Sequence, residues 1–318
     1  MANQIITNVC NANCGFCFAA ESRTRSLKEN RRQMDETEMR DWLAFTMAAG
    51  IKELRLLGVE PTIHPRFADF VRIGCEAGCR ITVFTNGVMP DPALEALAAL
   101  DTESCTVVVN TNAAIRPEDR KRQFAALKRL GERVTPGMTL TSVDFTLTAP
   151  LALIDAFGLR KAIRIGIANP TWGGSNCSVP PSRYSAVGQT LFEQSFIAAR
   201  WGVALEPDCG FVRCMFGMNF DKLNENGFKY VSRCAPVVDM CTGGMMLPCF
   251  GLSGLIRLDR RDYPDAKAAF DRFTEALKPW HSFGIYPECT QCRFFETEEC
   301  CGGCLSARLR RLVPMGDK

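Results

Sequence analysis

Short β-rich runs alternate with helical patterns over the first two thirds of the chain, and this alternation constrains the fold more than any other feature. Strands that alternate with helices form βα units, whose strands pair in parallel. The β-rich runs lie at 4–8, 53–57, 80–85, 104–110, 139–147 and 162–168, and the helical patterns at 35–49, 65–77, 92–99, 117–130 and 151–157. Six such strands predict an α/β fold of the open, partial (β/α)6 TIM-like barrel type, in which sites form at the C-terminal ends of the strands.

Three cysteines follow the first expected strand: Cys10, Cys14 and Cys17, with the spacing Cys-x3-Cys-x2-Cys. Cysteine thiolates are the usual protein ligands of iron–sulfur clusters. Three thiolates leave one iron of a [4Fe–4S] cluster open for a ligand that is not protein. The alternatives are three structural thiols or a zinc knuckle, but zinc sites generally complete four ligands and no fourth ligand lies nearby.

Composition narrows the class of protein. The chain has 318 residues, 17 cysteines and a net charge of +3, so the charge alone does not predict a nucleic-acid partner. We see no apolar run of about 18 residues and no signal peptide, and therefore expect a cytoplasmic protein with no membrane partner. The cysteines cluster toward both ends of the chain, which favours metal or cluster ligation over disulfides. We expect Cys75, Cys79 and Cys105, which lie between, to be buried as small apolar side chains.

The triplet, with the aromatic Phe16 directly before its last cysteine, resembles the signature of the radical S-adenosylmethionine (SAM) enzymes. The resemblance implies that the three cysteines hold a catalytic [4Fe–4S] cluster whose open iron binds SAM. It implies reductive cleavage of SAM to methionine and a 5′-deoxyadenosyl radical, which abstracts a hydrogen atom from the substrate. The implied electron donor is a low-potential protein of the flavodoxin or ferredoxin type.

Residues at the ends of other strands are similar to the SAM contacts of that family. The run Gly58-Val59-Glu60-Pro61 resembles the Gly-Gly-Glu-Pro motif that receives the SAM amino group, with Val59 in place of the second glycine. Asn86 ends the third strand, and a bland Asn-Gly turn explains it equally well. The resemblance also makes Asn110 and Asn112 candidate SAM contacts. Gly166 in the sixth strand allows either an adenine ring or a packed neighbour to approach.

Ten cysteines fall between residues 209 and 304, and we place a domain boundary near residue 206. The expected parts are a radical SAM partial barrel over 1–205 and an auxiliary-cluster domain over 206–318. The spacings in the second part resemble the SPASM extension, which holds two auxiliary [4Fe–4S] clusters. Carried over by position, the first cluster uses Cys234, Cys241, Cys249 and Cys304, and the second uses Cys289, Cys292 and Cys300.

The SPASM-like pattern departs from the family in two places: one spacer is longer, and no cysteine follows Cys304. The second cluster therefore has an open iron, borrows Cys301, Cys209 or Cys214, or is absent. A four-cysteine zinc ribbon over 289–304 is the competing interpretation. The basic residues Arg308, Arg310 and Arg311 are expected on a solvated helix face or as a C-terminal charge complement.

The resemblance to SPASM-type enzymes favours a peptide or protein side chain as substrate, modified by oxidation or cross-linking. Nine residues precede Cys10, so we expect no peptide-binding domain at this end of the chain. Either a separate protein presents the peptide, or the substrate is a small molecule such as an amino acid, a sugar or a cofactor precursor. A non-enzymatic iron–sulfur redox protein is the remaining alternative, and it would need a complete four-cysteine set at each site.

Overall fold

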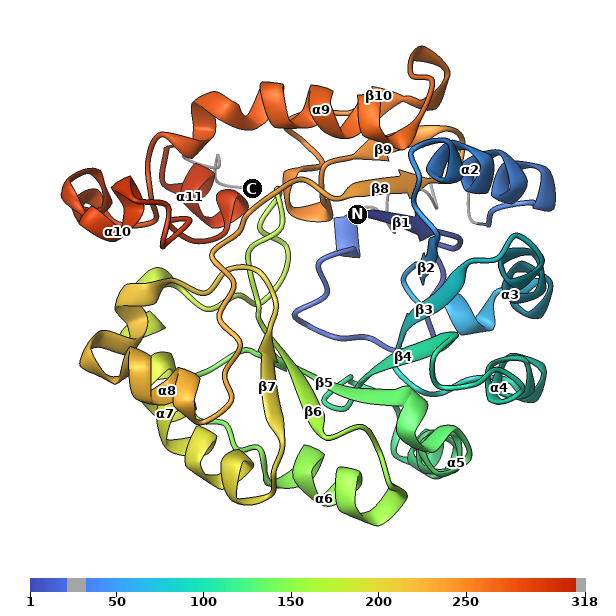
Figure 1. The fold of residues 1–318 in the computed structure, drawn as a ribbon, viewed down its shortest axis with the longest axis horizontal. Helices are drawn as coiled ribbons and strands as arrows, with labels where there is room; N and C mark the ends of the chain where they lie inside the picture. The colour runs from blue at the N-terminus through green and yellow to red at the C-terminus, as the bar shows by residue number, and fades with distance from the viewer. Residues whose placement is uncertain (22–32, 313–318) are drawn as a thin grey trace.

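One curved sheet forms the centre of the computed structural model, which describes residues 1–21 and 33–312 (Figure 1). Within these ranges its strands follow the order β10-β9-β8-β1-β2-β3-β4-β5-β6-β7. From β1 to β7 each strand pairs in parallel with the next one along the chain. These strands are β1 (Ala2–Ile5), β2 (Glu53–Leu57), β3 (Arg80–Thr85), β4 (Cys105–Asn110), β5 (Val134–Leu140), β6 (Ala162–Ile167) and β7 (Ala204–Pro207). The predicted partial barrel is confirmed.

Helices cover the outer face of the curved sheet (Figure 1). They are α2 (Glu36–Ala48), α3 (Phe67–Glu76), α4 (Asp91–Ala98), α5 (Arg120–Leu130), α6 (Thr148–Phe157) and α7 (Tyr184–Arg200). Helix α2 begins where expected, because the Asp35 side chain accepts a hydrogen bond from the Glu38 backbone N–H at 2.8 Å and caps the first turn. Its apolar side chains Trp42 and Phe45 are buried against the sheet. None of the helices in the described ranges has the length and apolar character needed to cross a membrane.

The fifth strand lies earlier in the sequence than predicted. It covers Val134–Leu140, whereas the β-rich pattern suggested 139–147. Pro136 and Gly137 lie inside it, and both residues normally argue against a strand interior. Gly137 is nonetheless favoured here, because an added Cβ would lie 3.3 Å from Cγ1 of Val108 on the neighbouring strand. The residues that looked most strand-like, 141–147, form the connection to α6.

The part of the chain after residue 206 extends the sheet on the other side of β1. Strand β8 (Val238–Cys241) pairs in parallel with β1, and β9 (Met245–Leu247) and β10 (Leu258–Asp259) follow in antiparallel order. The remaining helices are α8 (Phe220–Glu225), α9 (Ala266–Leu277), α10 (Arg293–Glu296) and α11 (Leu305–Leu312). Both parts of the chain therefore share one sheet, and the proposed boundary near residue 206 stays a prediction.

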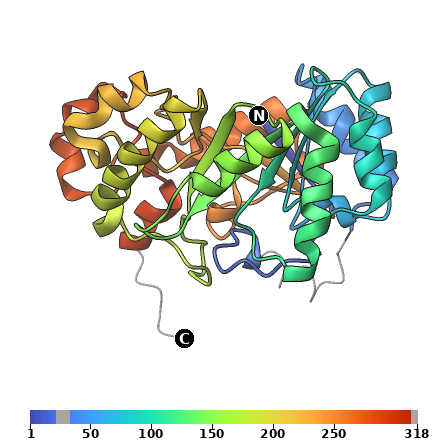
Figure 2. The ribbon, with the colours of Figure 1, turned by 90° about the horizontal axis from the view of Figure 1, so that it is seen from below.

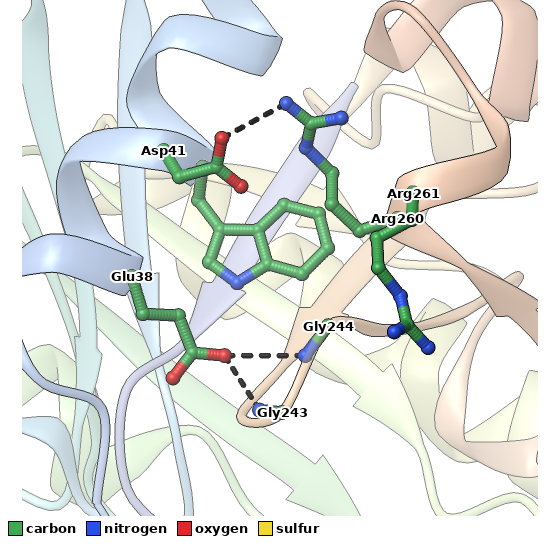
Figure 3. Close-up of a pocket in the computed structure, with 7 residues that line it drawn as sticks. Glu38, Asp41, Gly243, Gly244, Arg260 and Arg261 are labelled. Atoms are coloured by element: carbon green, nitrogen blue, oxygen red, sulfur yellow. Dashed lines mark hydrogen bonds and ion pairs between the residues drawn. The ribbon is translucent and has the colours of Figure 1, made fainter.

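Polar contacts fasten α2 to the turn between β8 and β9 (Figure 3). The Glu38 carboxylate accepts hydrogen bonds from the backbone N–H groups of Gly243 and Gly244, at 2.5 and 3.2 Å. Both glycines have positive φ, which suits a tight turn. Asp41 pairs with Arg260 at 3.0 Å. These residues line a surface pocket, and their contacts fix the β8–β9 hairpin against the barrel.

Three cysteines of the barrel, Cys75, Cys79 and Cys105, are partly or wholly buried. Cys79 and Cys105 lie in the main apolar core, at 6% and 1% exposure, which confirms the prediction for both. Cys75 is half-buried and packs against the same core. Burial raises the pKa of the Cys105 thiol to about 12, so this side chain stays neutral and acts as an apolar group.

Candidate active site

The cysteine triplet lies in the loop that follows β1, at the carboxyl edge of the parallel strands. Backbone N–H groups point at two of the sulfurs: Ala12 of this loop donates to Sγ of Cys10, and Ala114 of the connection after β4 donates to Sγ of Cys14, both at 3.2 Å. Burial raises the pKa of Cys10 to about 11, and the N–H group of Ala12 opposes that shift. Hydrogen bonds to cysteine sulfur are one of the means by which proteins stabilise and tune iron–sulfur clusters. The donor set therefore fits such a cluster.

The Gly58–Pro61 loop lies directly against the chain that leads into the triplet. Val59 N–H donates to the Thr7 carbonyl and Glu60 N–H to the Val9 carbonyl, both at 3.0 Å. Gly58 is required by this approach, because a Cβ there would lie 2.7 Å from the Thr7 carbonyl oxygen. Val59 replaces the second glycine of the family motif without strain, since among the described residues the one non-glycine with positive φ is Glu298.

The Glu60 carboxylate joins the ends of β2 and β3. It is 1% exposed and accepts hydrogen bonds from Thr62 N–H at 3.1 Å and from Asn86 N–H at 2.7 Å. The hydroxyls of Thr62 and Thr85 donate to it as well, each at 2.7 Å. Burial raises the pKa of Glu60, while these donors favour the ionised form. The side chain thus holds two loops together, and what the motif presents to the site is its backbone.

Asn86 connects this network to the cysteine loop itself. Its side-chain amide donates to Oδ1 of Asn11 at 2.7 Å, and Asn11 lies between Cys10 and Cys14. Gln123 of α5 donates to the Asn86 carbonyl at 2.6 Å. Sequence reasoning identified Asn86 but missed Asn11 and Gln123. The position of Asn11 inside the triplet was a usable signal, whereas nothing in the sequence of α5 marks Gln123.

The other expected SAM contacts lie at the carboxyl ends of β4 and β6. The amide of Asn112 forms two hydrogen bonds with the Thr139 backbone, at 2.8 and 3.0 Å, so it joins β4 to β5. Asn110 accepts from the Asn112 N–H at 3.1 Å. A Cβ on Gly166 would meet its nearest neighbour, Asp208 Cβ, at 3.7 Å, an ordinary contact. Packing therefore does not require glycine at position 166, and roles for all three residues in SAM binding remain predictions.

The loop after β6 lies beside the cysteine loop (Figure 2). Cys177 N–H donates to the Gly15 carbonyl at 2.7 Å, and the Asn176 amide donates to the Phe16 carbonyl at 3.3 Å. Phe16, the aromatic residue of the signature, is therefore held by its backbone as well as by the turn between the cysteines. Sequence reasoning described this segment as a loop and did not place it beside the triplet.

Charged and aromatic side chains meet across the inner face of the sheet. The guanidinium groups of Arg55 on β2 and Arg164 on β6 lie 5.0 and 4.7 Å from the ring centroid of Phe84 on β3. Arg164 also pairs with Asp208 at 2.7 Å. The Arg164 guanidinium holds the pKa of Asp208 below its usual value despite burial. This group was not found by sequence reasoning, because its members come from four separate strand regions.

The C-terminal cysteines lie in different surroundings. Cys234 and Cys249 pack against a small apolar cluster that contains Leu305, the residue after Cys304. Cys241 instead lies on β8 in an apolar cluster with Ile5 of β1, and Cys17 packs against that cluster. Cys289, Cys292 and Cys300 lie in or beside α10. The ligand sets carried over from the family are not tested by these placements.

Arg308 is buried, so the prediction that places it on a solvated helix face is wrong. Its side chain is 0% exposed. The guanidinium donates to the carbonyl oxygens of Gly303, Phe283 and Cys301, the first at 2.9 Å and the second at 3.1 Å. The guanidinium donates the hydrogen bonds that water would otherwise give to these three carbonyl groups. It thereby fixes the backbone of the loop between Cys300 and Cys304.

Single-ion sites require donors that converge more closely than those of a cluster. Across residues 1–21 and 33–312, no group of three or more His, Cys, Asp or Glu side chains could hold one metal ion. A multi-iron cluster makes a different demand, because each thiolate binds its own iron and the thiolates lie further apart.

Comparison with known proteins agrees with this geometry. Residues 5–145 match the family model described as the radical SAM superfamily. GTP 3',8-cyclase of Chlorobaculum tepidum is 29% identical over 146 residues, which is 42% of this chain and 41% of the cyclase. The match thus spans less than half of that relative's length.

Solved structures of SuiB from Streptococcus suis share the fold. The complex with S-adenosylmethionine aligns with a TM-score of 0.68 at 16% identity, over 95% of this chain and 72% of that one. The complex with the precursor peptide SuiA gives 0.66 at 16% identity, over 95% and 71%. Together with the cysteine triplet and the partial barrel, the family match shows that residues 5–145 form a radical SAM domain.

Proposed function

We propose that this chain reductively cleaves SAM and abstracts a hydrogen atom from a peptide or protein side chain. Cys10, Cys14 and Cys17 would hold the [4Fe–4S] cluster. When bound, the cluster supplies the electron that cleaves SAM to methionine and a 5′-deoxyadenosyl radical, the oxidant needed to break an unactivated C–H bond. The observation that carries the proposal is the joining of the cysteine loop to the Gly58–Pro61 loop and to Asn86 by backbone and side-chain hydrogen bonds.

The residues of this chain have three tasks in that reaction. The Asn86–Asn11 hydrogen bond and the Glu60 carboxylate hold the loops of β1, β2 and β3 in one arrangement before SAM arrives. The free backbone groups of the Gly58–Pro61 loop would orient the SAM amino group. The loop that carries Cys177 packs over Gly15 and would limit access of water to the site. Preorganisation of this kind raises rates because the loops need no reordering when the reaction begins.

The substrate assignment is supported by the fold relation to SuiB, which has been solved bound to the precursor peptide SuiA. The sequence similarity to GTP 3',8-cyclase supports the alternative, which is a small-molecule substrate. That similarity covers 41% of the cyclase, so most of that protein lies outside the comparison. The SuiB alignment instead covers 95% of this chain, including the cysteine-rich part, and we therefore favour a peptide.

The test is SAM cleavage by the full chain. The protein is reconstituted anaerobically with iron and sulfide, then given SAM and dithionite, and 5′-deoxyadenosine is measured. The wild type should form it, and Cys14→Ala should not. Cys75→Ala is the matched control, because it removes a half-buried thiol on α3 and should retain cleavage. A wild-type protein that binds iron at the triplet but forms no 5′-deoxyadenosine with or without candidate peptides would overturn the proposal.

A further inference from the structure

The segment between β7 and α8 carries two cysteines, Cys209 and Cys214, that the site described above does not use. Both are exposed, whereas Phe211 and Val212 between them are 2% and 1% exposed. The cysteines of this chain that fill the core, such as Cys105, are buried. The segment is therefore anchored by its apolar residues, and its two thiols have no packing role in the core.

The Cys214 end of the segment is bound to the chain that joins Cys292 to Cys300. Arg213 donates to the Glu299 carboxylate at 3.2 Å, and its guanidinium lies 4.1 Å from the ring centroid of Phe294. Both partners lie between those two cysteines in sequence. The Cys214 thiol also lies within electrostatic range of the thiols of Cys300 and Cys289. Cys214 is thus a neighbour of the incomplete second set.

The other end of the segment reaches the first set. A Cβ built on Gly303, next to Cys304, would lie 3.1 Å from Cγ1 of Val212. The Cys209 thiol lies within electrostatic range of three further thiols, those of Cys304, Cys234 and Cys249. Cys234 and Cys249 pack on the group of apolar side chains that contains Leu305, the residue directly after Cys304. The four thiols, which come from four separate segments, are therefore electrostatic neighbours.

Cys241, the fourth member carried over from the family pattern, lies in a different environment. It packs with Ile5, Leu57 and Leu247 near the cysteine triplet, and its Sγ lies 3.9 Å from the Asp239 carbonyl. Cys301, another alternative, directs its sulfur at the Gly303 carbonyl at 4.0 Å.

We propose that Cys209 completes a four-thiolate set with Cys234, Cys249 and Cys304, and that Cys214 completes a second one with Cys289, Cys292 and Cys300. One short Cys-x4-Cys segment would then supply a ligand to each of two [4Fe–4S] clusters. Neither cluster keeps an open iron, so both suit electron transfer and neither offers a binding site for substrate. The inference rests on the proposed function only in requiring iron–sulfur clusters in the C-terminal part.

The test isolates the auxiliary clusters. In the full chain, Cys10, Cys14 and Cys17 are all replaced by alanine, and this parent is reconstituted anaerobically with iron and sulfide. We expect about eight irons per chain, four for each cluster. Cys209→Ala and Cys214→Ala are then made singly in the parent, with Cys241→Ala and Cys301→Ala as matched controls. Circular dichroism before reconstitution checks that each variant keeps its fold.

The readout is an open iron, detected with ¹³C-labelled cyanide on the dithionite-reduced protein by pulsed EPR. We expect a ¹³C coupling in Cys209→Ala and in Cys214→Ala, or a fall to about four irons, and neither change in the parent or the controls. A coupling in the parent, or one that first appears in Cys241→Ala or Cys301→Ala, would overturn the assignment. Bound zinc in the parent, or a parent that takes up no iron, would also overturn it. The proposed cleavage of SAM is tested independently, in the wild-type protein.

Discussion

Glu60→Gln is the substitution that most directly tests how the site is held together. The glutamine has nearly the same shape, but an NH₂ group replaces one carboxylate oxygen. Four donors converge on the Glu60 carboxylate, and Asn86 N–H is the one that faces Oε2, at 2.7 Å. An amide nitrogen at that position would face another N–H. The buried Asn86 N–H would then lack an acceptor, which costs about 1–3 kcal/mol.

The alternative orientation of the amide gives no relief. It would place the NH₂ group at Oε1, where Thr62 N–H and two threonine hydroxyls donate. The hydroxyls can rotate, but the backbone N–H of Thr62 cannot, so one buried donor again lacks a partner. We therefore expect the free energy of unfolding to fall by about 1–3 kcal/mol whichever way the amide points.

Urea unfolding of the iron-free protein measures this change, and SAM cleavage after reconstitution measures its effect on the site. Glu53→Gln is the matched control: Glu53 begins the same strand and accepts from the Thr82 hydroxyl at 2.7 Å, at the opposite end of β2. We expect it to cost less than about 1 kcal/mol and to leave SAM cleavage intact. If Glu60→Gln unfolds at the wild-type urea concentration and cleaves SAM normally, the carboxylate does not hold the loops as argued.

Three further substitutions test other parts of the fold. Gly58→Ala should lower SAM cleavage at least about tenfold, since a Cβ 2.7 Å from the Thr7 carbonyl forces the loops apart; normal cleavage would contradict this. His64 is neutral in the fold, donating from Nε2 to the Met34 carbonyl and accepting the Arg66 N–H, and burial lowers its pKa. Because the unfolded chain gains a proton below about pH 6.5 and the folded one does not, stability should fall there by up to about 1.4 kcal/mol per pH unit. Thermal melts across pH should show this slope flattened in His64→Gln, and an unchanged slope would refute it. Arg308→Met leaves three carbonyls without their donor and should cost at least about 2 kcal/mol in urea unfolding, against almost no change for exposed Arg122→Met.

Local pattern was enough to locate most of the barrel, because each βα unit carries its own periodicity and its own caps. Strands β2 and β3 have the predicted bounds, and α2 begins one residue after the predicted start of its helical pattern. The fifth strand was misplaced because Pro136 and Gly137 have poor strand propensity. They nevertheless lie within β5, where packing against the neighbouring strands determines the conformation. Tertiary context overrode propensity there.

The site divides in the same way between local and long-range information. The cysteine triplet and the Gly58–Pro61 loop were found because their spacing is contained in short runs of sequence. The Asn86–Asn11 bond joins residues 75 apart, and the Gln123–Asn86 bond joins residues 37 apart. Such partners depend on how the strands close into a sheet. Arg308 shows the same limit, because a charge count cannot tell a solvated arginine from one enclosed by carbonyl groups.

The two proposals together restrict where a substrate can be recognised. If each auxiliary cluster has four thiolates, no iron in the C-terminal part is open to a substrate group, and recognition must come from side chains. The charged and aromatic group on the inner face of the sheet is the best candidate, because Arg55 and Arg164 both lie over the Phe84 ring. Arg164 is neutralised by Asp208, the residue before Cys209, so the barrel wall and the first auxiliary set are adjacent in the chain. A substrate held against that wall would therefore lie close to the segment that carries Cys209 as well as to the strands that end at the SAM site.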